Sequence, residues 1–272
     1  MTDLPQSDDL KLDERDGVLH LWFDRPEAKN ALSASMVDGV TRIARLLPAR
    51  DDLRAVVLRG SGGAFCAGGD LKEFGASFAS EAPTDGSPDP ILAMNRSFGT
   101  MLQLLDAIPQ TLIVGVEGPS FGGSLGIISV SDVAIATADA KFALSETSLG
   151  IPPAQIGPYV VRRIGLSHAR RLSLTGARFG AEEALRVGFV HEAVADAAAL
   201  EASIEAALKG VRRCAPGANG VTKELFTLSA HAIDGGLLDE AAIMFRDCLR
   251  GPEAAEGVGA FLEKRKPSWT GE

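Results

Sequence analysis

Two glycine-rich segments constrain the fold of this chain more than any other feature. The first is Phe65–Lys72, which contains Gly69, and the second is Gly118–Gly126, which contains Gly123. Each lies between an apolar run typical of a strand and a segment typical of the start of a helix. Such junctions leave backbone N–H groups unpaired, and glycine lets a ligand approach them closely. The two segments are either plain tight connections or an oxyanion hole, in which two backbone donors meet at one oxygen.

The composition limits the classes of function that this chain can have. Its 272 residues, of which 46% are hydrophobic and 23% charged, can bury a large core. The net charge of −9 argues against a nucleic-acid-binding surface. Cys66, Cys214 and Cys248 show neither metal-ligand spacing nor a disulfide framework, which indicates a reducing compartment. Because no signal peptide and no bilayer-spanning apolar run are visible, we expect a cytoplasmic protein with no membrane partner.

Alternating strand and helix patterns predict an α/β fold. Ser33–Leu47 has the apolar spacing of an amphipathic helix, with Ser33 or Ser35 as its N-cap and Pro48 just beyond its end. The segment Gly75–Asp89 has no periodicity, and we interpret it as a mobile loop that is either an active-site lid or a plain surface insertion. Four apolar, β-branched runs are expected to be strands: Val18–Phe23, Ala55–Leu58, Leu112–Val116 and Val133–Ala136.

The C-terminal part of the chain has helical patterns and almost no strand pattern. We therefore expect two regions, a core at residues 1–195 that carries both glycine segments and a helical region at residues 196–272. A helical region of this kind is expected to contact other subunits. The helices expected from about residue 181 onward are Ala181–Val187, Ala197–Arg213, Val221–Ala230, Leu237–Leu249 and Glu253–Lys264.

Short motifs along nearly the whole chain occur in an order that is specific although each motif alone is weak. They are Asp24–Leu32, Phe65–Lys72, Gly118–Gly126, Ser131–Val133, Phe142–Gly150, Leu174–Gly176 and Phe261–Pro267. In these motifs the chain resembles the crotonase superfamily of enoyl-CoA hydratases and isomerases. The resemblance implies a crotonase-type β-β-α superhelix with a C-terminal helical trimerisation region. It also implies a homotrimer or a dimer of trimers.

The resemblance assigns roles to residues in these motifs. It implies an acyl-CoA thioester substrate whose enolate oxygen accepts hydrogen bonds from the backbone N–H groups of Gly69 and Gly123. Glu146 matches a catalytic glutamate, and an apolar cleft would raise its pKa toward neutrality; a solvated glutamate is the alternative. No metal and no redox cofactor is implied, since coenzyme A is part of the substrate. The residues expected to bind the thioester are Ala28, Lys29, Ala67, Gly69, Asp70, Leu71, Lys72 and Gly123, with Phe261 and Lys264 supplied by a neighbouring subunit.

Gly126 departs from the hydratase pattern, because many hydratases have a second glutamate at this position. Glu146 alone either activates water, as in a hydratase, or moves a proton between carbons, as in a Δ3-Δ2 enoyl-CoA isomerase. The segment Glu146–Pro158 favours hydration and resembles enzymes that hydrate 3-methylglutaconyl-CoA or isohexenylglutaconyl-CoA. We expect Gly126 to leave room for the second carboxylate of such a branched substrate. A non-catalytic binding protein with the same fold is the remaining alternative.

Three arginines are candidates to pair with such a carboxylate, because a guanidinium matches a carboxylate geometrically. They are Arg96, Arg162 and Arg163. The alternative for each is a surface or interface charge.

Overall fold

A six-stranded sheet forms the centre of the computed structural model, which describes residues 4–5, 7–70, 72, 87, 89–230 and 234–271. Its strand order is β1-β2-β3-β4-β6-β9. β1 runs antiparallel to β2, and all other neighbours are parallel. The strands are β1 (Leu10–Arg15), β2 (Val18–Phe23), β3 (Ala55–Gly60), β4 (Thr111–Val116), β6 (Val133–Thr137) and β9 (Glu192–Val194).

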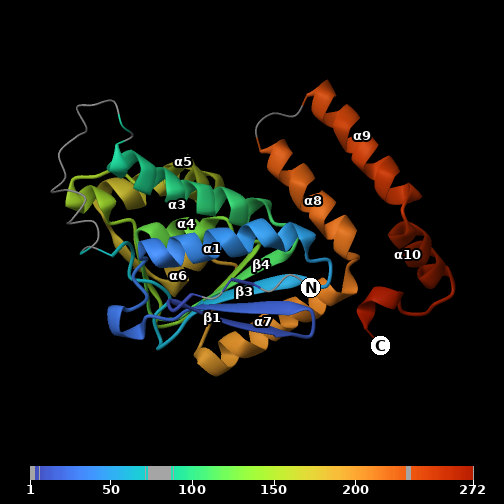
Figure 1. Cartoon of the computed structure of the whole chain (residues 1–272), viewed down its shortest axis with the longest axis horizontal. Coiled ribbons are helices and arrows are strands. Elements are labelled where there is room, and N and C mark those ends of the chain that lie inside the picture. Colours follow the sequence, from blue (N-terminus) through green and yellow to red (C-terminus); the bar gives the residue numbers. More distant parts are fainter. Residues whose placement is uncertain are drawn as a thin grey trace.

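Both faces of this sheet are apolar, as expected for a largely parallel sheet covered by helices on both sides. On one face, Val56 and Leu58 of β3 belong to the large core that includes residues of α1 (Ala34–Leu46) and α3 (Pro90–Ala107). On the other face, Ala55 and Val57 pack with Leu200, Ile204 and Leu208 of α7 (Ala197–Arg213). Figure 1 shows α1 and α3 above the sheet and α7 below it. The predicted α/β architecture is therefore confirmed.

The N-terminus of α1 follows the sequence prediction in detail. Ser33 is the N-cap, and its Oγ accepts a hydrogen bond from the Met36 N–H at 3.0 Å. This bond satisfies one of the N–H groups that the first turn of a helix leaves unpaired. Met36, Val40 and Ile43 then lie buried on the face of α1 that contacts the sheet.

A small second sheet lies beside the first and carries the elements around the second glycine segment. Its strand order is β5-β7-β8, and it comprises β5 (Pro119–Phe121), β7 (Lys141–Ala143) and β8 (Arg178–Gly180). The helix α4 (Gly123–Ser129) begins directly after β5, and the short 3-10 turn η3 (Glu146–Leu149) follows β7. The second sheet therefore places the start of a helix and an acidic turn side by side.

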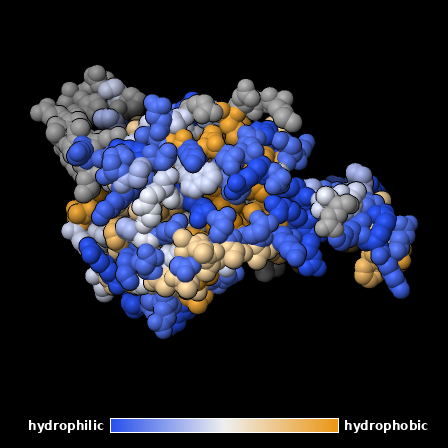
Figure 2. Space-filling model, turned by 90° about the horizontal axis from the view of Figure 1, so that it is seen from below, coloured by the Kyte–Doolittle hydropathy of each residue, from blue (hydrophilic) through white to orange (hydrophobic). Residues whose placement is uncertain are grey.

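The remaining helices include a C-terminal arm that stands away from the body. The arm consists of α8 to α10, and Figure 2 shows it projecting with an orange, hydrophobic area near its end. Phe226, Phe245 and Phe261 in these helices are 69%, 68% and 83% exposed. The arm helices are α8 (Pro216–Ser229), α9 (Gly235–Arg250) and α10 (Pro252–Leu262). The other helical elements not yet named are η1 (Pro26–Ala28), η2 (Leu47–Ala49), α5 (Gly157–Thr175), α6 (Ala181–Arg186) and η4 (Ser268–Thr270).

The boundary at residue 196 stays a prediction. In the structure α7 packs on the sheet, so the projecting helices begin with α8. The expected loop at Gly75–Asp89 lies almost wholly outside the described residues. Among the residues that are described, no helix is long and apolar enough to cross a bilayer.

Candidate active site

The two glycine segments are joined to each other by backbone hydrogen bonds. The Cys66 N–H donates to the Pro119 carbonyl at 3.1 Å, and the Phe121 N–H donates to the Cys66 carbonyl at 3.0 Å. Cys66 and Ser120 form a parallel bridge between the segments. The two glycine segments therefore lie side by side, and the meeting of their donors at one oxygen stays a prediction.

Two glycines with a positive φ form the turns themselves. Gly68 has φ +100°, and a Cβ there would lie 3.1 Å from the Phe121 carbonyl oxygen. Gly122 has φ 54° and ψ −122°, a conformation that side chains other than hydrogen rarely allow. Gly69 and Gly123 come next in each segment, and within the described ranges neither of their N–H groups has a hydrogen-bond acceptor. Two backbone N–H donors without an acceptor in the described part of the chain thus lie at neighbouring turns.

Glu146 lies beside the second turn. The Gly122 N–H donates to the Ala143 carbonyl at 2.9 Å, which ties the turn to the strand that leads into η3. Glu146 Oε1 is 3.3 Å from the point that a Cβ on Gly122 would occupy. Glu146 Oε2 is buried and has no hydrogen-bond partner in the described part of the chain. Burial raises the pKa of this carboxyl, as expected for a group that exchanges protons.

The wall next to these groups is apolar and closely packed. A Cβ on Gly123 would meet Leu32 Cδ1 at 3.1 Å and Phe98 Cζ at 3.2 Å. A Cβ on Gly126 would meet Ile156 Cγ2 at 2.5 Å and Leu102 Cδ1 at 2.9 Å. The expectation that Gly126 leaves room for a substrate carboxylate is therefore wrong, because two aliphatic side chains already fill the space beside it.

The motif Asp24–Leu32 supports the first turn, a role that the sequence analysis did not predict. The side chain of Asn30 is fully buried, and its Nδ2 donates to the carbonyls of Ser61 at 2.8 Å and Ala64 at 2.7 Å. Arg25 Nη2 lies 3.1 Å from Asp70 Oδ2, directly after Gly69. The signal in the sequence was the motif itself, with an arginine and an asparagine close before the helix α1.

The expected thioester-binding residues are only partly brought together. The Ala67 N–H donates to the Lys29 carbonyl at 3.0 Å, so Ala28 and Lys29 lie next to the first turn. Asp70 is paired with Arg25, and it accepts a hydrogen bond from the exposed Lys72 through the backbone N–H at 3.0 Å. Leu71 lies outside the described residues.

Phe261 and Lys264 lie apart from this group. Both are exposed, at and just after the end of α10. In Figure 1, α10 is on the opposite side of the molecule from the N-terminal end of α3, whose Phe98 packs beside Gly123. Within one chain these two residues therefore do not join the glycine turns.

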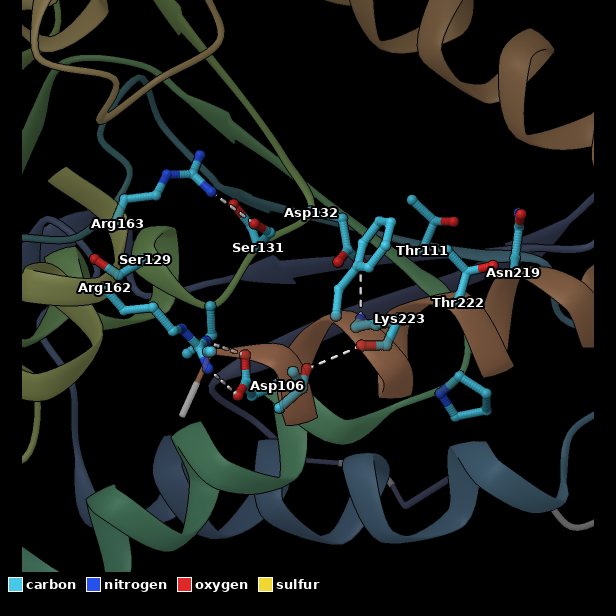
Figure 3. A pocket seen from close by; sticks show the side chains of 15 residues that line it. Asp106, Thr111, Ser129, Ser131, Asp132, Arg162, Arg163, Asn219, Thr222 and Lys223 are labelled. Carbon is cyan, nitrogen blue, oxygen red and sulfur yellow. Dashed lines mark hydrogen bonds and ion pairs between the residues drawn. The ribbon is translucent and has the colours of Figure 1, made fainter. Parts of the chain in front are cut away.

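A separate cavity of about 460 Å³ lies between α8, the end of α3 and the middle of α5. Figure 3 shows that Arg162 and Lys223 pair with aspartates, whereas Arg163 bonds to Ser131. Arg162 binds both carboxylate oxygens of Asp106, and Lys223 Nζ lies 2.8 Å from Asp132 Oδ2. Arg163 donates to the Ser131 carbonyl at 2.8 Å, and burial lowers its pKa to about 10. The charges here fix α8 and α5 to the body.

Comparisons with known proteins agree on one family. The enoyl-CoA hydratase/isomerase family model matches residues 13–272. A probable enoyl-CoA hydratase of Rhodobacter capsulatus is 31% identical over 264 residues, which cover 96% of this chain and 98% of that protein. The enoyl-CoA hydratase ACTT6 of Alternaria alternata is 34% identical over 245 residues, 90% of this chain and 78% of that protein.

Solved structures give the same answer. An enoyl-CoA hydratase/isomerase from Marinobacter aquaeolei has a TM-score of 0.92 and 43% identity, with 96% of this chain and 99% of that chain covered. Pseudomonas aeruginosa AtuE has a TM-score of 0.92 and 48% identity, with 97% of this chain and 100% of that chain covered. The expected crotonase-type fold is thereby confirmed, and the chain belongs to the enoyl-CoA hydratase/isomerase family.

Proposed function

We propose that this protein is a lyase that adds water to the double bond of 2-enoyl-CoA thioesters. The observation that carries the proposal is the position of Glu146. Its carboxylate lies against Gly122, beside the two turns that hold Gly69 and Gly123, and its buried Oε2 has no partner among the described residues. An acid–base group next to two free donors is the arrangement that chemistry through an enolate needs.

The reaction follows from these groups. Glu146 accepts a proton from a water molecule, and the oxygen of that water forms a bond to C3 of the enoyl group. The electron pair of the double bond moves onto the thioester oxygen, where the N–H groups of Gly69 and Gly123 stabilise the negative charge. Loss of one such donor typically costs about 3 kcal/mol of transition-state stabilisation. Glu146 then returns the proton to C2, so the product carries all the atoms of one water.

The binding of coenzyme A rests on the first turn and on a second copy of the chain. On this proposal, coenzyme A contacts Ala28, Lys29, Ala67, Asp70 and Lys72 beside Gly69. Phe261 and Lys264 come from a neighbouring copy, since they are exposed at the far side of their own chain. The exposed phenylalanines of the arm support a homotrimer or a dimer of trimers, because large apolar side chains are stabilised by burial between subunits.

A second candidate function is Δ3-Δ2 enoyl-CoA isomerisation. The observation that favours it is the packing of Ile156 and Leu102 against Gly126, which excludes a second carboxylate from that position. A single carboxylate can remove a proton from C2 of a 3-enoyl thioester and return it to C4 without any water.

One assay separates the two candidates. Purified protein is given crotonyl-CoA, 3-methylglutaconyl-CoA and a 3-enoyl-CoA, and the products are identified by mass. Hydration adds the mass of one water, and the Glu146→Gln variant abolishes that gain. A 3-enoyl thioester that is converted to the 2-enoyl form, with no water added to any thioester, would establish the isomerase instead.

The acyl group is proposed to be branched and of the glutaconyl type, as in 3-methylglutaconyl-CoA. The segment Glu146–Pro158 supports this through its resemblance to that group of hydratases. Gly126 gives it no support, because the space beside Gly126 is filled. The same assay tests the substrate class, since it compares crotonyl-CoA with 3-methylglutaconyl-CoA.

A further inference from the structure

Gly99 lies in the middle of α3, where glycine costs about 1 kcal/mol relative to alanine. The space that its missing side chain leaves is occupied. The side-chain amide of Gln155 approaches the point where a Cβ would be, with its Cδ at 2.7 Å. Gly99 therefore leaves room for the Gln155 amide in the wall between α3 and the segment before α5.

Gln155 is hydrogen-bonded to a second side-chain amide, that of Asn95, which lies on α3 one turn before Gly99. Its Nε2 donates to Asn95 Oδ1 at 2.8 Å. Two side-chain amides together offer four N–H donors and two carbonyl oxygens, so most of this capacity is unspent after one bond. No other hydrogen bond of either side chain occurs within the part of the chain that the structure describes. Both side chains are partly exposed, so their unused N–H donors are accessible to a ligand.

The amide pair lies beside the candidate active site. Asn95 and Phe98 are three residues apart on α3, so they share a face. Phe98 packs against Gly123, and Ile156, the neighbour of Gln155, packs against Gly126. The pair thus borders the apolar wall next to the oxyanion donor, at the distance of about one helical turn along α3.

A positive charge lies at the same place. Arg96 Nη1 is 3.1 Å from the Cβ point of Gly99 that the Gln155 amide also approaches. Among the described residues its guanidinium bonds two neutral groups, Thr100 Oγ1 and Gln103 Oε1, both at 3.2 Å. No carboxylate in the described ranges forms an ion pair with it.

The other two candidate arginines are engaged elsewhere. Arg162 binds Asp106, and Arg163 is held by backbone carbonyls, both at the cavity in Figure 3. Of the three, Arg96 is the one that lies beside the Gln155 amide.

We propose that Asn95, Gln155 and Arg96 form a subsite that binds a carboxylate at the far end of the acyl group. This inference rests on the proposed acyl-CoA site. A carboxylate has two oxygens that accept several hydrogen bonds, and it matches two amide donors and one guanidinium. The substrates selected are then thioesters of dicarboxylic acids, and the residues that select them lie on α3 and before α5 rather than at Gly126.

The test uses the full-length protein and two saturated thioesters, glutaryl-CoA and butyryl-CoA, which differ by the terminal carboxylate. Neither can be hydrated, so calorimetry measures binding alone. We expect the unaltered protein to bind glutaryl-CoA about tenfold more tightly. Gln155→Glu, which keeps the side-chain length and adds a negative charge, should abolish this preference and leave the dissociation constant of butyryl-CoA nearly unchanged. Ser167→Glu adds the same charge at an exposed position of α5 and should preserve the preference.

Equal binding of the two thioesters by the unaltered protein would overturn the inference. So would a Gln155→Glu variant that loses affinity for both ligands equally, because a purely structural tether predicts that result. If Gln155→Glu does not fold, Arg96→Met changes an exposed side chain and should lose most of the preference. A protein that prefers glutaryl-CoA but hydrates no thioester would contradict only the proposed function.

Discussion

The turn around Glu146 and the cavity beside α8 differ in whether their polar groups have interaction partners. In the cavity, Lys223 lies against Asp132 and Arg162 against Asp106, so each of these two cations has a carboxylate partner. Around Glu146, one carboxylate oxygen and the N–H groups of Gly69 and Gly123 have none within the described residues. Paired charges hold two elements together, whereas unpaired groups cost stability unless a ligand uses them. The difference separates a structural contact from a candidate active site.

The comparison predicts that a change at Glu146 affects turnover and not stability. Glu146→Gln removes the proton acceptor but keeps the shape, so kcat should fall by about 10²–10⁴. The free energy of unfolding should stay the same or rise, since a neutral amide is easier to bury than a carboxylate. Rates of hydration of crotonyl-CoA and urea unfolding check both parts. Turnover near that of the unaltered protein would remove Glu146 from the chemistry.

A second prediction concerns the glycine that faces Glu146. Gly122→Ala places a methyl group 3.3 Å from Glu146 Oε1 in a backbone conformation that disfavours it. The Gly123 donor should shift, and kcat should fall by about 10²-fold. Gly63→Ala is the matched control, because Gly63 also has a positive φ of 73° but no atom within 4 Å of the new Cβ. Both variants should lose similar stability, and an equal loss of kcat in both would refute a special role for Gly122.

At the cavity beside α8 we expect a substitution to change stability and to leave turnover nearly unchanged. Lys223→Met leaves Asp132 without its cation, and the free energy of unfolding should fall by about 1–3 kcal/mol. The turnover of the folded protein should change little. Arg246→Met, at an exposed pair with Asp247, is the control and should cost less than 1 kcal/mol. Chemical unfolding measures both. A large drop in kcat with unchanged stability would place this cavity in the function instead.

The sequence could predict the parts of this molecule that depend on local pattern. The strands β2, β3, β4 and β6 are runs of apolar and β-branched residues, and α1 has a serine cap at Ser33, so periodicity and capping found them. β1 was missed because its residues Leu10–Arg15 are mostly charged and lie at the edge of the sheet. An edge strand needs little apolar surface, which leaves no clear signal.

The candidate site shows the same limit at the level of single residues. The two turns and Glu146 were found because glycine pattern and motif order are local features. The space beside Gly126 was misjudged, because Ile156 and Leu102 fill it from other elements. The role of Gly99 was equally hidden, since only the three-dimensional structure brings Gln155 against it. A glycine in the sequence shows only that a side chain is absent. Which atoms occupy the space beside it depends on the three-dimensional fold.

The smallest expected effect is the pH dependence that the unpaired carboxyl causes. Burial raises the pKa of Glu146 above its ordinary value of 4.5, so between these two values the folded protein holds a proton that the unfolded chain releases. Stability contributed by this group is therefore present below pH 4.5 and is lost as the pH rises through the folded pKa. Unfolding measured from pH 4 to pH 8 should show the stability of Glu146→Gln increasing relative to that of the unaltered protein as the pH rises.

In parallel, kcat/KM should fall as the pH drops through the same raised pKa of Glu146, because the proton acceptor must be ionised. The matched control is Asp132→Asn, because the Asp132 carboxylate is held by Lys223 and by the backbone N–H of Leu112. If both variants responded to pH alike, the contrast between paired and unpaired groups would fail as an account of the two regions.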